Sequence, residues 1–259
     1  SANWDTPQNV TVTGVDDDPI DGDQTSTLTI SILDVVSDDD FDNVPDRTLS
    51  VTTTDDDVAG FTIAETDGST SVTEAGSTDL FTVVLNAQPA TDVVLSISSS
   101  DTGEATVTSS LTFTAANWDT AQNVTVTGAD DDIVDGSVTS TITVAINDGS
   151  SDDNFDAVAD QTVSVTTTDD DVAGFTIAET DGSTGVTEAG STDLFTVVLT
   201  GRPITDVAFS ISSSDLTETS VTSSLTFTSE NWNTPQNVTV TGLDDDIIDG
   251  TQTLSLIHI

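Results

Sequence analysis

The sequence repeats itself at a fixed offset of 114 residues, the distance from residue 51 to residue 165. Residues 51–90 read VTTTDDDVAGFTIAETDGSTSVTEAGSTDLFTVVLNAQPA, and residues 165–204 differ from them at only a few positions. The same offset relates the NW motifs that begin at Asn3, Asn117 and Asn231. A period of this length indicates one folded unit copied in tandem. Such arrays span distances, present surfaces or bind repetitively, and they seldom catalyse reactions.

The period divides the chain into three segments. Residues 1–57 correspond to the C-terminal half of a first repeat, residues 58–171 to a complete repeat, and residues 172–259 to the N-terminal part of a third. We therefore expect the chain to be a segment of a longer protein. Residues 254–259 (LSLIHI) depart from the repeat pattern and are interpreted as an assembly artefact, so His258, the only histidine, is assigned no function.

The formal net charge is −45, with only two Lys and Arg residues and no cysteine. Nucleic acid is excluded as a partner because binding of phosphates requires Lys and Arg, and an anionic membrane surface is disfavoured for the same reason. No run is apolar enough to insert into a membrane. Disulfides and thiol chemistry are excluded as well. Valine, isoleucine, leucine and phenylalanine are nevertheless frequent and regularly placed, which favours a folded chain over a disordered acidic tail.

Apolar residues alternate with threonine and serine along most of each repeat. Examples are Leu28, Ile30 and Ile32, and the equivalent residues Ile142, Val144 and Ile146. This period of two is typical of strands with one buried and one wet face. About eight such runs per repeat, separated by DG, GS and DDD turns, predict an antiparallel β-sandwich of immunoglobulin-like size. The predicted fold is all-β: tandem sandwiches joined by very short linkers into an elongated rod.

The acidic residues are bunched in loops rather than spread over the strands. In the complete repeat they form DDDIVDG, SDDNFD, a closing DDD and SSSDTGEA, the last with Asp101 and Glu104. Adjacent carboxylates repel one another, and Ca²⁺, which binds oxygen ligands in irregular loops, would remove that repulsion. The spacing is not that of an EF-hand. The alternative is that these are solvated, turn-forming aspartates of a salt-adapted protein, and the residues alone leave both interpretations open.

Several motifs, in order, resemble the Calx-beta domains repeated in large bacterial surface and secreted proteins: VTEAGSTDLFTVVL, SSSDTGEA, LTFTAANWDTAQNVTVTGADDDIVDG and VSVTTTDDD. The resemblance covers the whole repeat and implies a calcium-binding β-sandwich whose ions lie at one end, near the next domain. It matches Glu74 to the early glutamate of the family, Asp131 and Asp132 to its middle acidic pair, and Asp169 to Asp171 to its closing run. Asp135 stands where the family usually has a glutamate, and residues 108–110 replace its usual aspartate-tyrosine.

The predicted cofactor is therefore Ca²⁺. The candidate ligands are Asp55, Asp56, Asp57, Glu65, Glu74, Asp101, Asp130, Asp131, Asp132, Asp135, Asp169, Asp170, Asp171, Glu179, Glu188, Asp244, Asp245 and Asp246. We expect the ions at the junctions between repeats. At the first junction the prediction pairs Asp55, Asp56 and Asp57 with Glu65 or Glu74 of the next repeat. At the second it pairs Asp169, Asp170 and Asp171 with Glu179 or Glu188.

Two other motifs recur once per repeat. Trp4, Trp118 and Trp232 could stack on a sugar, but a Trp packed over the end of the core is the favoured interpretation. Asn9, Asn123 and Asn237 lie in N-glycosylation sequons, and outward polar strand residues are the favoured alternative there. The abundant threonine and serine would also permit O-linked glycans.

The sequence favours a structural function outside the cell. It offers no Cys, no Lys and no credible His for catalysis, so an enzyme is not expected. The predicted function is a segment of an extracellular or bacterial cell-surface fibre or adhesin stalk, stiffened by calcium. Its expected partners are the neighbouring repeats, with self-association into filaments and bound glycans as further candidates. The alternative is a module that binds carbohydrate or ice through its threonine-rich faces or its tryptophans.

Overall fold

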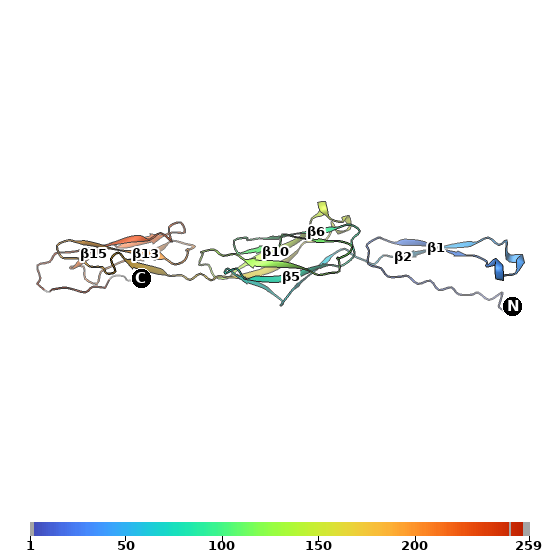
Figure 1. The fold of residues 1–259 in the computed structure, drawn as a ribbon, viewed down its shortest axis with the longest axis horizontal. Coiled ribbons are helices and arrows are strands. Elements are labelled where there is room, and N and C mark those ends of the chain that lie inside the picture. Colours follow the sequence, from blue (N-terminus) through green and yellow to red (C-terminus); the bar gives the residue numbers. More distant parts are fainter. Residues whose placement is uncertain (1–2, 249, 256–259) are drawn as a thin grey trace.

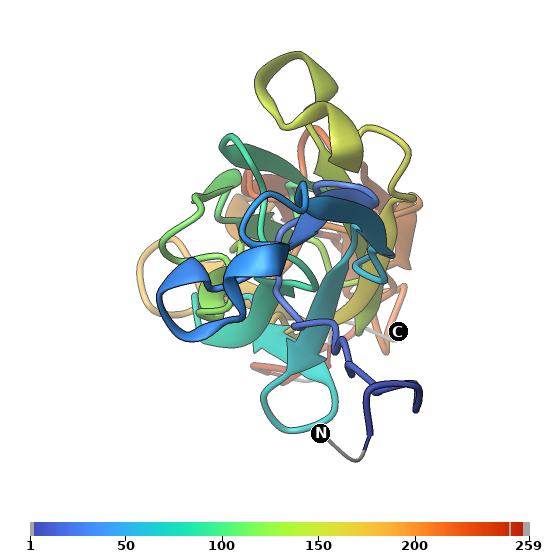
Figure 2. The same cartoon turned by 90° about the vertical axis from the view of Figure 1, so that its right-hand side faces the viewer.

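The computed structural model describes residues 3–248 and 250–255, and its shape is elongated (Figure 1). Three groups of strands follow one another along the long axis in chain order, and they lie behind one another when viewed along that axis (Figure 2). We call the described residues up to 57, from 58 to 171, and from 172 onward the first, middle and third segments. All the named strands pair within their own segment. The structure confirms the predicted all-β rod of immunoglobulin-like sandwiches.

The middle segment is a sandwich of two sheets. One sheet has the strand order β4-β11-β10-β6-β8 and the other β3-β5-β9-β7. Every pair is antiparallel except β11 with β4, which is parallel. The strands are β3 (Phe61–Glu65), β4 (Thr70–Thr73), β5 (Thr78–Leu85), β6 (Val93–Ser99), β7 (Ala105–Val107), β8 (Ser110–Phe113), β9 (Gln122–Gly128), β10 (Val138–Ile146) and β11 (Gln161–Thr168).

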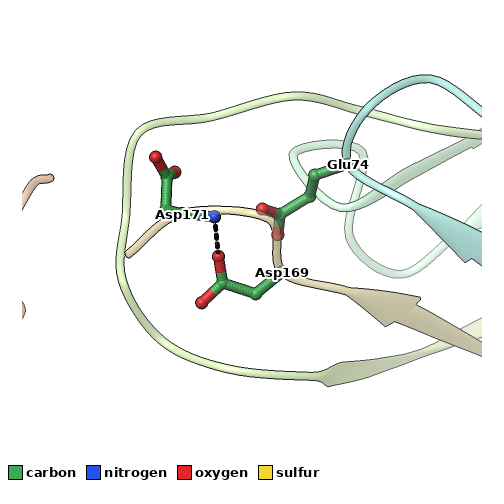
Figure 3. Close-up of side chains that lie close together, drawn as sticks. All are labelled: Glu74, Asp169 and Asp171. Carbon is green, nitrogen blue, oxygen red and sulfur yellow. Dashed lines mark hydrogen bonds between the residues drawn. The ribbon is translucent and has the colours of Figure 1, made fainter. Parts of the chain in front are cut away.

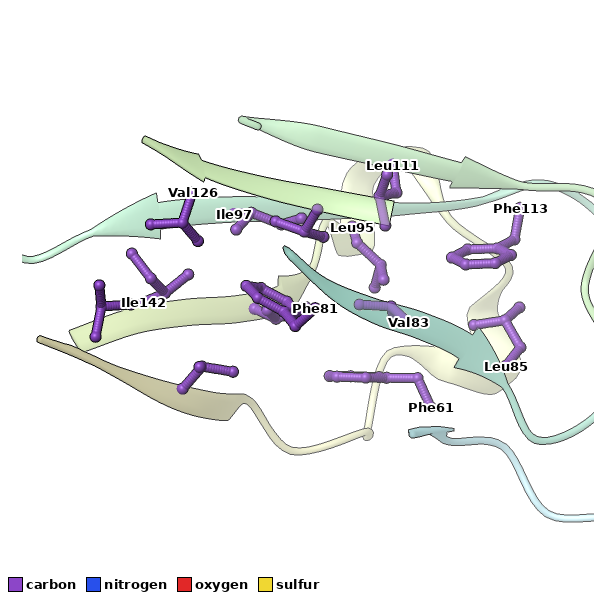
Figure 4. Close-up of a cluster of buried hydrophobic side chains, with 14 of the residues drawn as sticks. Phe61, Phe81, Val83, Leu85, Leu95, Ile97, Leu111, Phe113, Val126 and Ile142 are labelled. Carbon is purple, nitrogen blue, oxygen red and sulfur yellow. The ribbon is translucent and has the colours of Figure 1, made fainter. Parts of the chain in front are cut away.

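The alternating pattern of the sequence places the core between these sheets. On β10, Ile142 and Val144 are fully buried while Thr141 faces solvent, and on β11 Val165 is fully buried between exposed neighbours. Because side chains on a strand point alternately to its two faces, the apolar set of each strand meets that of the opposite sheet. The large aromatic Phe81 is fully buried near the centre of this core (Figure 4).

The other two segments contain parts of the same sandwich. The third has a complete four-stranded sheet, β12-β13-β17-β15, and a two-stranded sheet, β14-β16. The first has one hairpin, β1-β2. Their bounds are β1 (Gln24–Ile30), β2 (Arg47–Thr53), β12 (Phe175–Glu179), β13 (Thr192–Leu199), β14 (Val207–Ser210), β15 (Thr219–Val221), β16 (Ser224–Phe227) and β17 (Gln236–Gly242). Four 3-10 turns are η1 (Asp34–Val36), η2 (Asp39–Phe41), η3 (Asp148–Ser150) and η4 (Asp153–Phe155).

Neighbouring segments touch through the acidic loops. In the loop after β9, Ile133 forms a parallel bridge with Arg202 of the third segment. The Arg202 N–H donates to the carbonyl of Asp132 (2.6 Å), and the Val134 N–H donates to the carbonyl of Arg202 (3.0 Å). The first junction has the equivalent bridge between Pro19 and Gln88. Each junction is therefore held by main-chain contacts from a loop that is rich in aspartate.

No helix within the described residues is long and apolar enough to cross a membrane. Of the proposed artefact at residues 254–259, only residues 254 and 255 are described; His258 lies outside the described residues.

Candidate metal centre

Five carboxylates from four loops meet at the end of the middle segment that faces the third. Glu74 follows β4, Glu104 precedes β7, Asp135 lies in the loop after β9, and Asp169 and Asp171 follow β11. They form two overlapping groups, Glu74 with Asp169 and Asp171, and Glu74 with Glu104 and Asp135. Within each group, one oxygen of every carboxylate lies within 4.8 Å of the others. We call these five residues the carboxylate cluster.

The parallel pairing of β4 with β11 brings Glu74 into the cluster. Thr73 lies opposite Thr168, and the Glu74 N–H donates to the Thr168 carbonyl (3.1 Å). Both strands therefore end at the same edge of the sheet, so the residues that follow them are neighbours. Gly128 allows this approach, because a Cβ at that position would lie 2.0 Å from the carbonyl oxygen of Thr73.

Asp169 organises the loops around it. Its Oδ2 accepts hydrogen bonds from the N–H groups of Gly136 (2.7 Å) and Asp135 (3.1 Å), and its Oδ1 accepts one from the N–H of Asp171 (2.7 Å). Figure 3 shows this last bond and the Glu74 carboxylate lying beside the loop that carries both aspartates. The hydrogen bonds, that of Gly136 foremost, lower the pKa of Asp169, so its negative charge is stabilised.

Four buried carboxylate oxygens in the cluster have no hydrogen-bond partner. They belong to Glu74, Glu104, Asp135 and Asp171. Glu74 is only 1% exposed and Glu104 only 6% exposed. Buried polar atoms are nearly always hydrogen-bonded, because leaving one unsatisfied costs about 1–3 kcal/mol. Ser140 Oγ is the only other such side-chain atom in the part of the chain that the structure describes.

Burial and mutual repulsion raise the pKa values of these same carboxylates. The pKa of Glu74 rises from 4.5 to about 7, through its burial first and then through the charges of Asp169 and Glu104. Burial, followed by neighbouring aspartates, also raises the pKa values of Glu104, Asp135 and Asp171. The cluster is therefore an unfavourable arrangement when all five groups are charged and no cation is present.

A divalent cation that prefers oxygen ligands fits this arrangement. Ca²⁺ binds six to eight oxygens at about 2.3–2.6 Å, so two oxygens on one ion lie at most about 5 Å apart. The oxygens of each group lie within that limit, and the donors are all carboxylates. The absence of Cys and nearby His from the set argues against zinc or copper. Glu74 belongs to both groups, so the two candidate ligand sets share one carboxylate.

The predicted pairing of residues across the junctions is wrong. Glu74 lies with Asp169 and Asp171 of its own repeat, not with Asp55, Asp56 and Asp57 of the preceding one. The reason is the parallel β4-β11 pair, which carries Glu74 to the opposite end of the sandwich from Asp57. Glu179 and Glu188 likewise form no group with Asp169, Asp170 and Asp171 among the described residues. The carboxylates thus gather at a junction but come from a single repeat.

The first segment contains Asp55 and Asp57, which are the counterparts of Asp169 and Asp171 in the carboxylate cluster. Asp55 accepts hydrogen bonds from the N–H groups of Gly22 (2.6 Å) and Asp57 (2.9 Å), as Asp169 does from the equivalent Gly136 and Asp171. Asp56 is exposed. The counterparts of Glu74 and Glu104 would precede residue 1, so the described chain offers these aspartates no glutamate from their own repeat.

The remaining predicted ligands lie outside both groups. Glu65 accepts a hydrogen bond from Thr70 Oγ1 (2.9 Å), and Asp131 Oδ1 accepts one from the N–H of Ile133 (2.6 Å). Asp131 nevertheless lies close enough for its charge to raise the pKa of Asp135. Within the described chain, no three-carboxylate group includes Asp101, Asp130, Asp131, Asp132, Asp170, Glu179, Glu188, Asp244, Asp245 or Asp246.

Sequence reasoning missed Glu104 as a candidate ligand and chose Asp101 from the same loop. Asp101 is exposed, and its Oδ1 accepts the N–H of Gly103 (2.9 Å), so it forms the turn. Glu104 comes directly before β7 and is turned inward by that strand. The repeat comparison could not separate the two, because both acids recur in the third segment as Asp215 and Glu218.

One aspartate of the SDDNFD motif has a structural role. Asp152 is 5% exposed and accepts hydrogen bonds from the N–H groups of Thr91 (2.8 Å) and Asn154 (3.0 Å). It caps η4 and seats the buried Phe155. Asp152 therefore forms a turn, as the alternative interpretation expects of these aspartates, but it is buried rather than solvated.

The tryptophans and sequons occupy different environments. Trp118 and Trp232 are partly buried and pack against the cores of their segments, whereas Trp4 of the incomplete first segment is 83% exposed. Asn123 and Asn237 are outward-facing residues of β9 and β17, and Asn9 is exposed. Glycosylation of the three asparagines and binding of carbohydrate or ice stay predictions.

Comparison with known proteins gives structural similarity only. No family model matches the chain, and no curated protein matches it. Among solved structures it is similar to the calcium binding domain CBD12 of CALX1.1, with a TM-score of 0.32, 18% identity, and coverage of 71% of this chain and 76% of that one. It is also similar to domains 1–6 of the surface layer protein SbsC, with a TM-score of 0.34, 15% identity, and coverage of 91% and 29%.

A third solved structure, the E. coli chaperone DraB, has a TM-score of 0.33 and 9% identity and is covered over 88% of its chain. All three TM-scores are low. The assignment of function therefore rests on the chain's own residues.

Proposed function

We propose that this chain is a structural segment of an extracellular fibre or adhesin stalk, in which calcium stiffens a row of β-sandwiches. The observation that supports the proposal most directly is the carboxylate cluster, with four unpartnered buried oxygens at the end of one sandwich where the next begins. Cations that occupy the site in the working protein would explain why these oxygens are buried without hydrogen-bond donors.

The acidic loop connects the cluster to the junction. Residues 130–136 carry Asp135 into the cluster and, through Ile133, form the bridge to Arg202 of the next segment. A cation held by Asp135 would fix the position of this loop, and the loop in turn would fix the third segment. Without the cation, repulsion among the carboxylates would loosen the same loop. Stiffness of the rod is thereby coupled to calcium.

The same chemistry supports an extracellular location. Calcium is plentiful outside cells and scarce in the cytoplasm, so a calcium site that stiffens a fibre would be occupied most reliably outside the cell. Metal binding then contributes directly to folding, so an exported chain would complete its folding after it leaves the cell. Near-identical repeats suit a spacer, because every unit has the same task.

The test is calcium binding by two variants of one loop. Glu104→Gln removes a buried cluster oxygen and should weaken calcium binding by at least about tenfold, measured by isothermal titration calorimetry. Asp101→Asn is the matched control, because it removes the same charge three residues away at an exposed position. The control should bind calcium nearly as the unmodified chain does. Equal affinities of the two variants, or no binding by the unmodified chain, would refute the proposal.

A further inference from the structure

The SDDNFD turn, residues 151–156, has a contact that its role within its own repeat does not explain. The side-chain Nδ2 of Asn154 donates a hydrogen bond to the main-chain carbonyl of Ile20 (3.2 Å), a residue of the first segment that is 134 positions away. Ile20 lies in residues 16–22 (DDDPIDG), which correspond to the acidic loop at residues 130–136. We call residues 16–22 the incoming loop. The turn of one repeat therefore contacts the acidic loop of the repeat before it.

Two further contacts hold the incoming loop. The N–H of Gln88, in the connection between β5 and β6, donates to the carbonyl of Asp18 (2.9 Å), beside the bridge with Pro19. The side chain of Ile20 packs against the hydrophobic core of the middle segment. Gln88 is itself held in place, because its side-chain Nε2 donates to the carbonyl of Ala115 (2.8 Å). The loop is thus bound at two carbonyls and by one aliphatic side chain.

The buried Asp152 joins the two parts of the middle segment that make these contacts. Its Oδ2 accepts a hydrogen bond from the N–H of Thr91 (2.8 Å), and its Oδ1 accepts one from the N–H of Asn154 (3.0 Å). Thr91 lies in the same connection as Gln88, and the fully buried Phe155 anchors the turn in the core. The two hydrogen-bond donors are therefore held in position by the middle segment itself, which lowers the entropic cost of binding the loop.

We propose that residues 86–92 and 151–156 form a docking site for the acidic loop of the preceding repeat, and that residue 154 determines how firmly the loop is held. The partner is a neighbouring repeat, recognised through the carbonyls of Asp18 and Ile20 and through the Ile20 side chain. The inference rests on these contacts and not on bound calcium. It gives the junction a side-chain contact in addition to the main-chain bridge.

The repeats differ at this position although their sequences are otherwise very similar. The equivalent of Asn154 in the first segment is Asp40. The turn itself is the same there, since Asp38 Oδ1 accepts a hydrogen bond from the N–H of Asp40 (3.1 Å), as Asp152 does from the N–H of Asn154. An ionised aspartate has no hydrogen to donate and would repel a carbonyl oxygen. A docking site with aspartate at this position therefore lacks one of its two donors.

The experiment measures the angle between the first and middle segments in the full chain. Spin labels are placed on cysteines introduced at Thr52 and Thr112, which are exposed residues of the two segments. Asn154→Asp should broaden the distance distribution relative to the unmodified chain, because the donor to the incoming loop is lost. The turn should persist, since the first segment forms it with Asp40. All chains are compared in one calcium-containing buffer, so a failure of the calcium proposal would not alter the comparison.

Asn147→Asp is the matched control. It makes the same substitution in the same connection between β10 and β11, at an exposed residue whose side chain makes no capping hydrogen bond. Its distance distribution should equal that of the unmodified chain. Equal widths for all three chains would overturn the inference. Equal broadening by both variants would overturn it as well, because added charge and not the lost donor would then be the cause.

Hydrogen exchange at the Gln88 amide tests the apolar contact. This N–H donates across the junction to Asp18, so its protection reports whether the incoming loop is docked. Ile20→Ser should speed its exchange by at least about tenfold, while exchange at the buried Val124 stays slow and shows that the sandwich is folded. Val15→Ser is the control, since Val15 is 82% exposed just before the same loop. Equal exchange at Gln88 in the two variants would overturn the proposed docking.

Discussion

Glu74 has an unusual position for a carboxylate, since it is almost fully buried among other acids in a chain with only two basic residues. No arginine or lysine balances it, and one of its oxygens has no hydrogen-bond partner. Such a group is neutralised when it binds either a proton or a metal cation. Its pKa of about 7 implies that near neutral pH the two compete for it. Calcium binding should therefore weaken as the pH falls below neutrality.

The first prediction concerns the stability of the metal-free protein. Since the pKa of Glu74 is higher in the folded state than its ordinary 4.5, the stability that its protonation gives is fully present below about pH 4.5 and is lost as the pH rises through about 7. In EDTA the melting temperature should therefore fall between pH 5 and pH 8, by the equivalent of on the order of 2 kcal/mol.

The effect of Glu74→Gln on the melting temperature should have opposite signs in EDTA and in calcium. In EDTA at pH 8 the variant should melt higher than the unmodified chain because a buried charge is gone, and in calcium it should melt lower because a ligand is gone. The control is Asp160→Asn, at an exposed position before β11 and away from the cluster, which should change neither value. A variant that melts lower in both solutions would show that Glu74 has only a packing role.

At the scale of elements, one strand pair decides where the cluster forms. The parallel β4-β11 pair places residues 74 and 169 side by side, although they are far apart in sequence. The last residue of β9, Gly128, lies against the backbone of Thr73 at the end of β4. The third segment has the same close approach between Gly242 and Thr187. The backbones of these two strands therefore lie so close together that no side chain fits between them at this point.

The second prediction is that Gly128→Ala disrupts this contact. A Cβ would lie 2.0 Å from a backbone oxygen, which no side-chain movement can relieve, so β4 must shift and take Glu74 with it. We expect a loss of about 2 kcal/mol in unfolding free energy and weaker calcium binding, measured by denaturant unfolding and calorimetry. Gly149→Ala is the control, because its Cβ would meet nothing within 4 Å. Equal stability of the two variants would contradict the prediction.

At the scale of the whole molecule, the rod is a row of sandwiches whose junctions consist of a short linker and one bridging loop. The bridge at Ile133 and Arg202 involves only main-chain groups, so any substitution that keeps the backbone in place should keep it. Under the proposed function, the rigidity of this bridge depends on the loop that carries Asp135. Cation binding at the end of one sandwich should consequently restrict the angle to the next.

The third prediction is a calcium-dependent distribution of distances between segments. Spin labels on cysteines introduced at the exposed Thr162 of the middle segment and Asn233 of the third report the junction directly. The distribution should be narrow in calcium and broad in EDTA. Labels at Thr162 and Asp119, both exposed and both in the middle segment, should give the same distribution in either solution. Equal widths across the junction with and without calcium would contradict the rod proposal.

The sequence by itself determined the fold class and the repeating architecture. An alternation such as that of Ile142 and Val144 on β10 is typical of a strand with one buried face, because successive side chains on a strand point in opposite directions. The fixed offset then predicted one repeating unit. The loop location of the acids was equally readable, since local turn chemistry and strand patterning are short-range properties.

Only the tertiary structure decided which acids meet. Glu74 and Asp169 are neighbours because β4 pairs with β11 in parallel, a contact that no local pattern specifies. Glu104 is buried and Asp101 is exposed although they share one short loop, because the start of β7 turns one of them inward. Ligand sets depend on long-range strand order and on the direction of single side chains. Those are set by packing of the whole sandwich, so the sequence located the acidic loops correctly and paired their residues wrongly.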